Sequence, residues 1–232
     1  MSNFINIDYT FEFSANSTKS FHIALDPLTL RIETKNVDSP PSWTRLEYNR
    51  CCVCKLDIKE HQHCPIALNL VGFIEEFKDY LSHQEVNVVV KVDEREYVKR
   101  LPLQFGLSSL LGAIMVSSGC PTMELLKPNL RFHLPFASIE ETVYRSFTMF
   151  LLAQFYKYRK GIEVDFDLAE FEKIFTDVGK VNKAFSERLR EASTKDASIN
   201  ALVNLHCLGE MTPMTVSDIL DEIEQYYTAH LE

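Results

Sequence analysis

The chain has 232 residues and a net charge of −9, and 46% of its residues are hydrophobic. This length and apolar content exclude a disordered chain, because they are enough to bury a sizeable core. The negative charge disfavours a nucleic-acid partner, and the absence of GxGxxG and GxxxxGK[ST] sequences argues against an α/β enzyme with a phosphate-binding loop.

The first hundred residues predict an antiparallel sheet. Apolar and polar residues alternate there with the two-residue period of strands, and Asp26-Pro27 is typical of a tight turn. Two further segments, joined by residues 93–96, indicate a hairpin because both contain β-favouring valines. The predicted strands are residues 4–13, 21–25, 28–33, 86–92 and 97–101.

A helix is predicted to begin at Cys64-Pro65, because proline suits the first turn of a helix. Apolar residues then recur every three or four positions to about residue 82. Beyond Pro102 every segment has helical periodicity. The predicted helical segments are residues 103–118, 124–126, 139–160, 168–178, 180–192, 199–208 and 216–231.

Residues 139–160 form the longest of these predicted helices. Ser138 followed by Glu141 is the pattern of a capping box at its start. Its interior is apolar nearly all round, which predicts the central helix of a bundle.

These elements predict an α+β fold, in which an antiparallel β-rich N-terminal part packs on a C-terminal helical bundle. Residues 1–102 form the β-rich part, with a cysteine-rich metal loop at residues 49–67 and one helix. Residues 103–232 form the all-helical part, and the acidic excess lies in residues 161–232. No low-complexity linker separates the two parts, so we expect one compact unit.

Neither an export signal nor a membrane span is expected. The N-terminal residues lack a basic segment followed by a continuous apolar run, and the most apolar stretch, residues 105–116, has 12 residues where a span needs about 20. We therefore expect a cytoplasmic protein, in which six cysteines are not a disulfide framework. Clustered cysteines in that setting indicate a metal site or redox chemistry.

Four of the six cysteines and two histidines lie within residues 51–64. Cys51-x-x-Cys54 is the tight knuckle with which two thiolates bind one ion, and Cys64 follows at the predicted helix start. The partial positive charge at a helix N-terminus favours the thiolate of Cys64. We predict that these three residues are metal ligands.

A closed tetrahedral zinc site needs a fourth ligand. Cys120 is our first choice, because Gly119-Cys120-Pro121 lies in a turn just past a predicted helix and repeats the Cys-Pro pair of Cys64-Pro65. With Cys120 as a ligand, the metal joins the β-rich part to the helical part. The alternates are His63, His61 and Cys52.

Zinc is the metal that this ligand set favours. Cys-Pro pairs also occur in ferredoxin-type motifs, so an iron–sulfur cluster in a redox or gas-sensing protein stays open as the alternative. A closed thiolate site leaves no position for a water molecule, which disfavours a zinc hydrolase. We therefore expect a metal-binding regulatory or adaptor protein, without catalysis of its own, that binds another protein through a helical surface.

Arg131 and His133 are candidates for a polar site. Both lie in an apolar, aromatic segment just before residues 139–160, where a polar side chain needs a partner. His133 could act as a general base or as a sensor near the metal. The alternative is that both side chains bond backbone carbonyls and fix the loop.

Several sequence strings occur together in residues 43–138. They are WTxL at 43–46, CxxC at 51–54, CPxA at 64–67, GLSSLLG at 106–112, SSGCP at 117–121 and RFHLPFAS at 131–138. With these strings the chain resembles an uncharacterised family of bacterial cytoplasmic proteins, a domain of unknown function. The resemblance implies a bacterial, cytoplasmic source and no reaction or cofactor. The chain departs from the expected Cys-x-x-Cys-Pro, because Lys55 follows Cys54 and Cys52 is an extra cysteine, which leaves the ligands at that end open.

Overall fold

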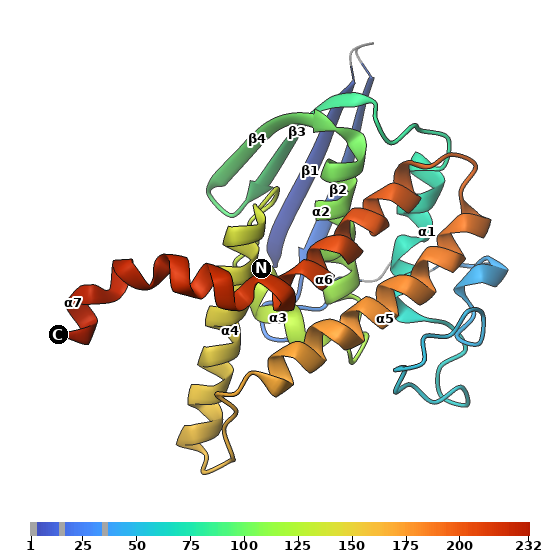
Figure 1. Ribbon diagram of the computed structural model, residues 1–232. Helices are drawn as coiled ribbons and strands as arrows, with labels where there is room; N and C mark the ends of the chain where they lie inside the picture. Colours follow the sequence, from blue (N-terminus) through green and yellow to red (C-terminus); the bar gives the residue numbers. More distant parts are fainter. Residues whose placement is uncertain (1–3, 14–16, 34–36) are drawn as a thin grey trace.

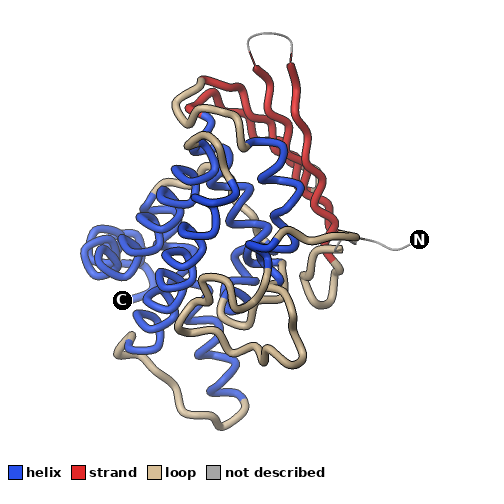
Figure 2. The backbone as a smooth tube through the Cα atoms, turned by 90° about the vertical axis from the view of Figure 1, so that its right-hand side faces the viewer, coloured by secondary structure: helices blue, strands red, loops and turns tan. Residues whose placement is uncertain are grey.

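The computed structural model describes residues 4–13, 17–33 and 37–232. Four antiparallel strands form one sheet, and the helices gather on one of its faces (Figure 2). The predicted α+β fold is therefore confirmed, with the sheet in the N-terminal half of the chain, one helix between its second and third strands, and the other helices after it.

The sheet has the strand order β2-β1-β3-β4. Tyr9 in the middle of β1 pairs with Phe21 of β2 on one side and with Val90 of β3 on the other. Alternate residues of β1 and β3 are buried, so the sheet has one core face, as the two-residue period predicts. The strands are β1 (Ile5–Phe13), β2 (Ser17–Leu25), β3 (Glu85–Val92) and β4 (Arg95–Pro102).

The prediction of a further strand at residues 28–33 is wrong. The Asp26 carboxylate accepts hydrogen bonds from the N–H groups of Leu28 and Thr29, which curls the chain into a turn. Leu30 then adopts a positive φ of 54°, and only one bridge, between Leu25 and Ile32, follows. The local side-chain bond therefore outcompetes strand pairing.

The main core lies between the sheet and two helices, α1 (Pro65–Phe77) and α2 (Leu103–Ser117). Gly106 brings α2 close to the sheet, because a Cβ at that position would be 2.9 Å from the side chains of both Phe11 and Val88. The long helices α5 (Ala169–Ala192) and α6 (Ala197–Ile223) lie side by side and complete this core (Figure 1).

Shorter segments connect these helices. They are the 3-10 turns η1 (Ser42–Thr44), η2 (Met123–Leu126) and η3 (Glu224–Tyr227), and the helices α3 (Lys127–Arg131) and α7 (Thr228–Leu231). Figure 1 shows that α7 lies far from the sheet, at the end of an arm that continues α6.

The capping box that begins α4 (Ile139–Arg159) is confirmed. The Ser138 hydroxyl accepts from the N–H of Glu141 at 3.1 Å, and the Glu141 carboxylate accepts from the N–H of Ser138 at 2.7 Å. The prediction that this helix is central is wrong, because it lies at the edge of the helical layer (Figure 1). Its Phe150 packs in a smaller second core with Phe171 and Val216, while Phe155 is 51% exposed.

Two predicted helix breaks do not occur. Residues 168–178 and 180–192 belong to one continuous helix, α5, and α6 runs without interruption through Pro213. Gly179 does not end α5, because tertiary packing against α6 outweighs the modest helix penalty of one glycine.

Candidate metal centre

Cys51 and Cys54 are held in one tight turn. The N–H of Cys54 donates to the carbonyl of Cys51 at 3.0 Å, and the Arg50 guanidinium donates to the carbonyl of Leu56 at 2.6 Å. This part of the chain contains no regular element between η1 and α1, so backbone and side-chain hydrogen bonds shape it. Both cysteines are partly buried.

Cys64 is the N-cap residue of α1, as the sequence predicts. Its N–H donates to the carbonyl of Thr44 at 2.8 Å, which fixes the start of the helix beside η1. Burial raises the pKa of the Cys64 thiol, while the N–H groups of Ala67 and Ile66 and the charge of Arg188 act in the opposite direction. The helix start thus partly offsets the effect of burial, which dominates and favours the neutral thiol.

Cys120 lies in the turn between α2 and η2. Gly119 has a φ of +88°, which glycine adopts without strain, and it turns the chain so that Cys120 is 9% exposed. Burial raises the pKa of this thiol too, while N–H groups of Met123 and Thr122 oppose the effect.

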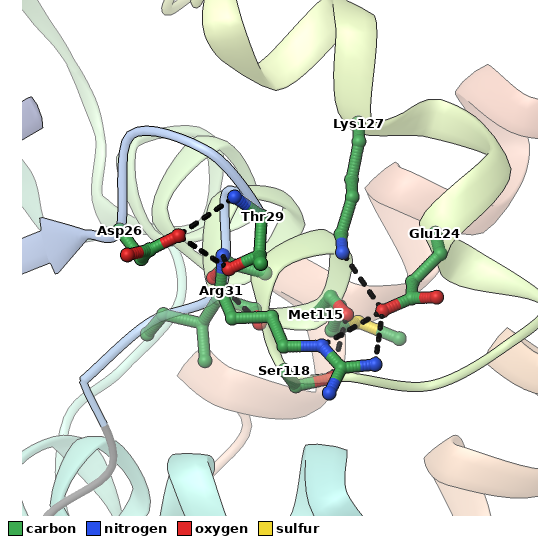
Figure 3. A network of polar contacts seen from close by, with 9 residues as sticks. Asp26, Thr29, Arg31, Met115, Ser118, Glu124 and Lys127 are labelled. Atoms are coloured by element: carbon green, nitrogen blue, oxygen red, sulfur yellow. Dashed lines mark hydrogen bonds and ion pairs between the residues drawn. The ribbon is translucent and has the colours of Figure 1, made fainter.

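A network of polar contacts holds this turn in place (Figure 3). The Glu124 carboxylate accepts from Arg31 at 2.9 Å and from Lys127 at 2.7 Å, and the pKa of Glu124 is lowered chiefly by its bond to Lys127. Arg31 follows the turn after β2, whose Asp26 and Thr29 are also drawn in Figure 3. The position of Cys120 is therefore set by contacts with the N-terminal part of the chain.

The four predicted ligands meet. Cys51, Cys54, Cys64 and Cys120 line one cavity of about 20 Å³, although they come from three separate segments. Burial raises the pKa of Cys51 to about 12, and the negative charges that Cys54, Cys120 and Cys64 would carry add to this rise. Four thiolates this close repel one another, so a cation among them would favour their deprotonation.

The side chains of the four cysteines are not arranged around a common metal position. Within residues 4–13, 17–33 and 37–232, no three histidine, cysteine, aspartate or glutamate side chains stand in an arrangement that would hold a metal ion. The fold thus brings the four cysteines to one cavity, but their side chains are not arranged to coordinate one ion. Their chemistry fits zinc, since thiolates are ligands that zinc favours.

The alternate ligands lie elsewhere. His63 Nδ1 is 2.8 Å from the Thr44 hydroxyl, and His61 and Cys52 are exposed. None of the three lines the cavity of the four cysteines.

Arg188 of α5 is the residue of this site that sequence reasoning missed. It is 3% exposed, and its guanidinium donates to the carbonyls of Trp43 at 2.6 Å, Arg45 at 2.8 Å and Leu46 at 3.2 Å. Burial lowers its pKa, and the neighbouring cysteines oppose this. A signal was available, because Arg188 follows Phe185 and precedes Leu189 on the apolar stripe of an amphipathic helix.

Arg131 and His133 do not form one polar site. Arg131 pairs with Asp93 at 3.4 Å, whereas His133 Nε2 lies 2.6 Å from the Tyr9 hydroxyl. In the part of the chain that the structure describes, both side chains contact other side chains and neither bonds a backbone carbonyl. The alternative, in which both bond backbone carbonyls, is therefore also wrong. His133 instead lines a second, larger cavity.

With this geometry, comparison with known sequences becomes informative. Residues 7–228 match the family described as a domain of unknown function, DUF6901. The chain belongs to this family. The DUF6901 match includes the sheet, the long helices and all four cysteines of the cavity. No curated protein and no solved structure matches the chain.

No membrane-crossing helix is found in the described part of the DUF6901 chain, where each helix is too short or too polar to cross a bilayer.

Proposed function

We propose that the chain is a zinc-binding regulatory or adaptor protein, with Cys51, Cys54, Cys64 and Cys120 as the zinc ligands. The observation that carries this proposal is their convergence on one cavity from three separate segments. In this proposal the four cysteine side chains rotate to form a closed tetrahedral site around the ion, and such a site leaves no position for a reacting water molecule. The zinc is therefore structural and the site is not catalytic.

The size of the cavity favours zinc over the alternative, an iron–sulfur cluster. A cavity of about 20 Å³ has roughly the space of one water molecule, which suits a single ion better than a four-iron core. Arg188 lies beside the site, and its positive charge offsets part of the net charge of −2 that four thiolates give with one zinc ion, as it also would with an oxidised four-iron cluster. A buried cation is what such an anionic centre requires.

The proposed role of the zinc is to fasten the loop of residues 45–64 to the helical part. Cys51, Cys54 and Cys64 belong to the loop and its boundary with α1, while Cys120 follows α2. The adaptor role is supported by α4, whose outer face exposes Leu152, Phe155 and Tyr156 for a protein partner. A thiolate site of this kind suits a reducing compartment, which supports a proposed location in the cytoplasm.

Metal analysis of the purified chain tests this function. Protein prepared with and without air is measured for zinc and iron, and its visible spectrum is recorded. We expect one zinc per chain and a colourless protein under both conditions. Brown protein with about four irons would establish the cluster instead, and a metal-free protein with unchanged melting temperature would exclude both.

The matched control is Cys52→Ser. Cys52 is exposed and lies between two of the ligands without lining the cavity. Zinc content is expected to stay at one per chain in Cys52→Ser and to be lost in Cys51→Ser. Equal zinc content in the two variants would contradict the ligand assignment.

A further inference from the structure

The second cavity of the molecule has a volume of about 1010 Å³. It runs along one face of α2 from Phe105 to Val116, a distance of about 16 Å at 1.5 Å per residue. Small-molecule sites in proteins have volumes of about 300–1,000 Å³ and mostly apolar walls. The apolar part of this wall includes Met123, Leu126, Leu130, Phe175, Val178 and Leu205.

Arg145 of α4 gives the wall a positive charge. Its guanidinium donates to the carbonyls of Asn129 at 2.7 Å and Phe132 at 2.8 Å, which fixes its position. Its pKa is lowered by burial and raised by Glu141, whose carboxylate is already bonded to the N–H of Ser138. No ion pair within 4 Å is found for Arg145 among the residues of known placement. The cavity thus contains a fixed cation with unused donors.

Next to this cation lies a buried chain of hydrogen bonds. The Tyr9 hydroxyl is 2.8 Å from the Ser109 hydroxyl and 2.6 Å from His133 Nε2, and both Ser109 and His133 line the cavity. Burial and the charge of Arg145 lower the pKa of His133 to about 4, so its ring is neutral near pH 7. With Tyr9 donating to Nε2, the ring carries its hydrogen on Nδ1 as a further donor.

An amide on the same wall has unused hydrogen-bonding capacity. Asn182 is 1% exposed, and neither its Nδ2 nor its Oδ1 has a partner in the part of the chain that is described. Asn204 Nδ2 is also buried without a partner there, and both residues line the cavity. A buried polar group without a hydrogen-bond partner is unfavourable, so these amides give the wall spare hydrogen-bonding capacity for a bound molecule.

We propose that this cavity binds an amphipathic organic acid, whose carboxylate pairs with Arg145 and whose apolar body lies along α2. The carboxylate is chosen because guanidinium donors recognise it in a bidentate manner. The lining has two other cations, Lys99 and Arg100, and both are exposed side chains of β4. Arg145 is partly buried and held by two carbonyls, so it is the anchor. None of the four cysteines lines this cavity, and the proposal does not depend on zinc.

Binding of decanoate and of decanol to the purified full chain tests the proposal by calorimetry. The two probes share an apolar body of similar length and differ in charge. We expect one decanoate per chain, bound at least tenfold more tightly than decanol. In Arg145→Gln, decanoate binding should weaken about tenfold while decanol binding stays unchanged, which also shows that the cavity remains folded. Equal affinity for the two probes in the wild type would overturn the carboxylate assignment.

Gly209→Leu tests the location. Gly209 lines the cavity, and a Cβ added there has no atom within 4 Å, so a leucine fills space without a clash. We expect decanoate binding to weaken at least tenfold. Gly72→Leu is the matched control, since Gly72 is an exposed helical glycine with the same free space outside the cavity. Wild-type decanoate affinity in Gly209→Leu, or no decanoate binding by the folded wild type, would overturn the proposal.

Discussion

Two cavities lie against neighbouring stripes of α5 and differ in size and chemistry. Val181, Phe185 and Arg188 line the cysteine cavity of about 20 Å³, whereas Val178 and Asn182 line the cavity of about 1010 Å³. The small cavity gathers ionisable sulfurs with two arginines, Arg50 and Arg188, whereas the large one has a mostly apolar wall with a few charged and hydrogen-bonding groups. Size and the density of polar groups together indicate an ion in the first and an organic molecule in the second.

The walls of the two cavities also differ in what holds them together. The large cavity is lined mainly by helices, together with residues of β3 and β4, and these elements pack through two hydrophobic cores. The loop beside the small cavity has little regular structure and depends on Arg188, on backbone bonds and, in our proposal, on zinc. Perturbing one cavity should therefore leave the other intact, and the following experiments test this separation.

Cys64→Ser should have the largest effect. We expect it to lose zinc and to lower the free energy of unfolding by on the order of 5 kcal/mol, because metal binding to such a site is coupled to folding. Zinc analysis and urea denaturation of the same sample measure both quantities. Cys52→Ser should resemble the wild type, and an equal loss of stability in both variants would contradict a shared metal site.

Arg188→Leu should be the next most damaging change. It removes the guanidinium bonds to the carbonyls of Trp43, Arg45 and Leu46. We expect a loss of about 3 kcal/mol in the free energy of unfolding, together with faster zinc release to a chelator. Arg190→Leu is the control, because Arg190 is exposed on the same helix and pairs with Glu187. If the two variants lose similar stability, Arg188 does not support the loop.

His133 should make the large cavity sensitive to acid. Its pKa is about 4 in the fold and 6.5 ordinarily, so the unfolded chain binds more protons between these values and stability falls as the pH drops from 6.5 towards 4. Between pH 7 and pH 5 this contributes at most about 2 kcal/mol. Urea denaturation at both pH values should show a smaller difference for His133→Gln than for the wild type, and an unchanged difference would argue against a neutral, buried imidazole.

Gly209→Leu and Gly72→Leu should have the smallest effects on stability. Each replaces a helical glycine that has free space at Cβ, so both should stabilise the chain by roughly 0.8 kcal/mol. Thermal denaturation measures the gain. If Gly209→Leu is destabilised while Gly72→Leu is stabilised, the large cavity has no free space for a side chain at Gly209.

Local sequence signals predicted the parts of the fold that local chemistry decides. The helix start at Cys64-Pro65, the hairpin of β3 and β4, and the capping box at Ser138 depend on neighbouring residues, and all three are confirmed. Residues 28–33 do not form the expected strand, because the Asp26 carboxylate accepts a hydrogen bond from the N–H of Thr29. The alternation of apolar and polar residues does not reveal this bond.

Features that depend on partners distant in sequence were harder to predict. The apolar residues of α4 were correctly identified as helical, but periodicity does not say which face has a neighbour, and Phe155 is exposed. The choice of Cys120 used a local turn signal, and the structure places it with the three other cysteines. Arg188 and the large cavity have no comparable motif, because their surroundings come from several helices.

X-ray absorption at the zinc edge of the purified chain tests the central claim most directly. It counts the atoms bound to the metal and identifies them as sulfur or nitrogen. Our proposal predicts four sulfurs at about 2.3 Å and no nitrogen. A site with one or more histidine nitrogens would contradict the assignment of Cys51, Cys54, Cys64 and Cys120 as the complete set of ligands.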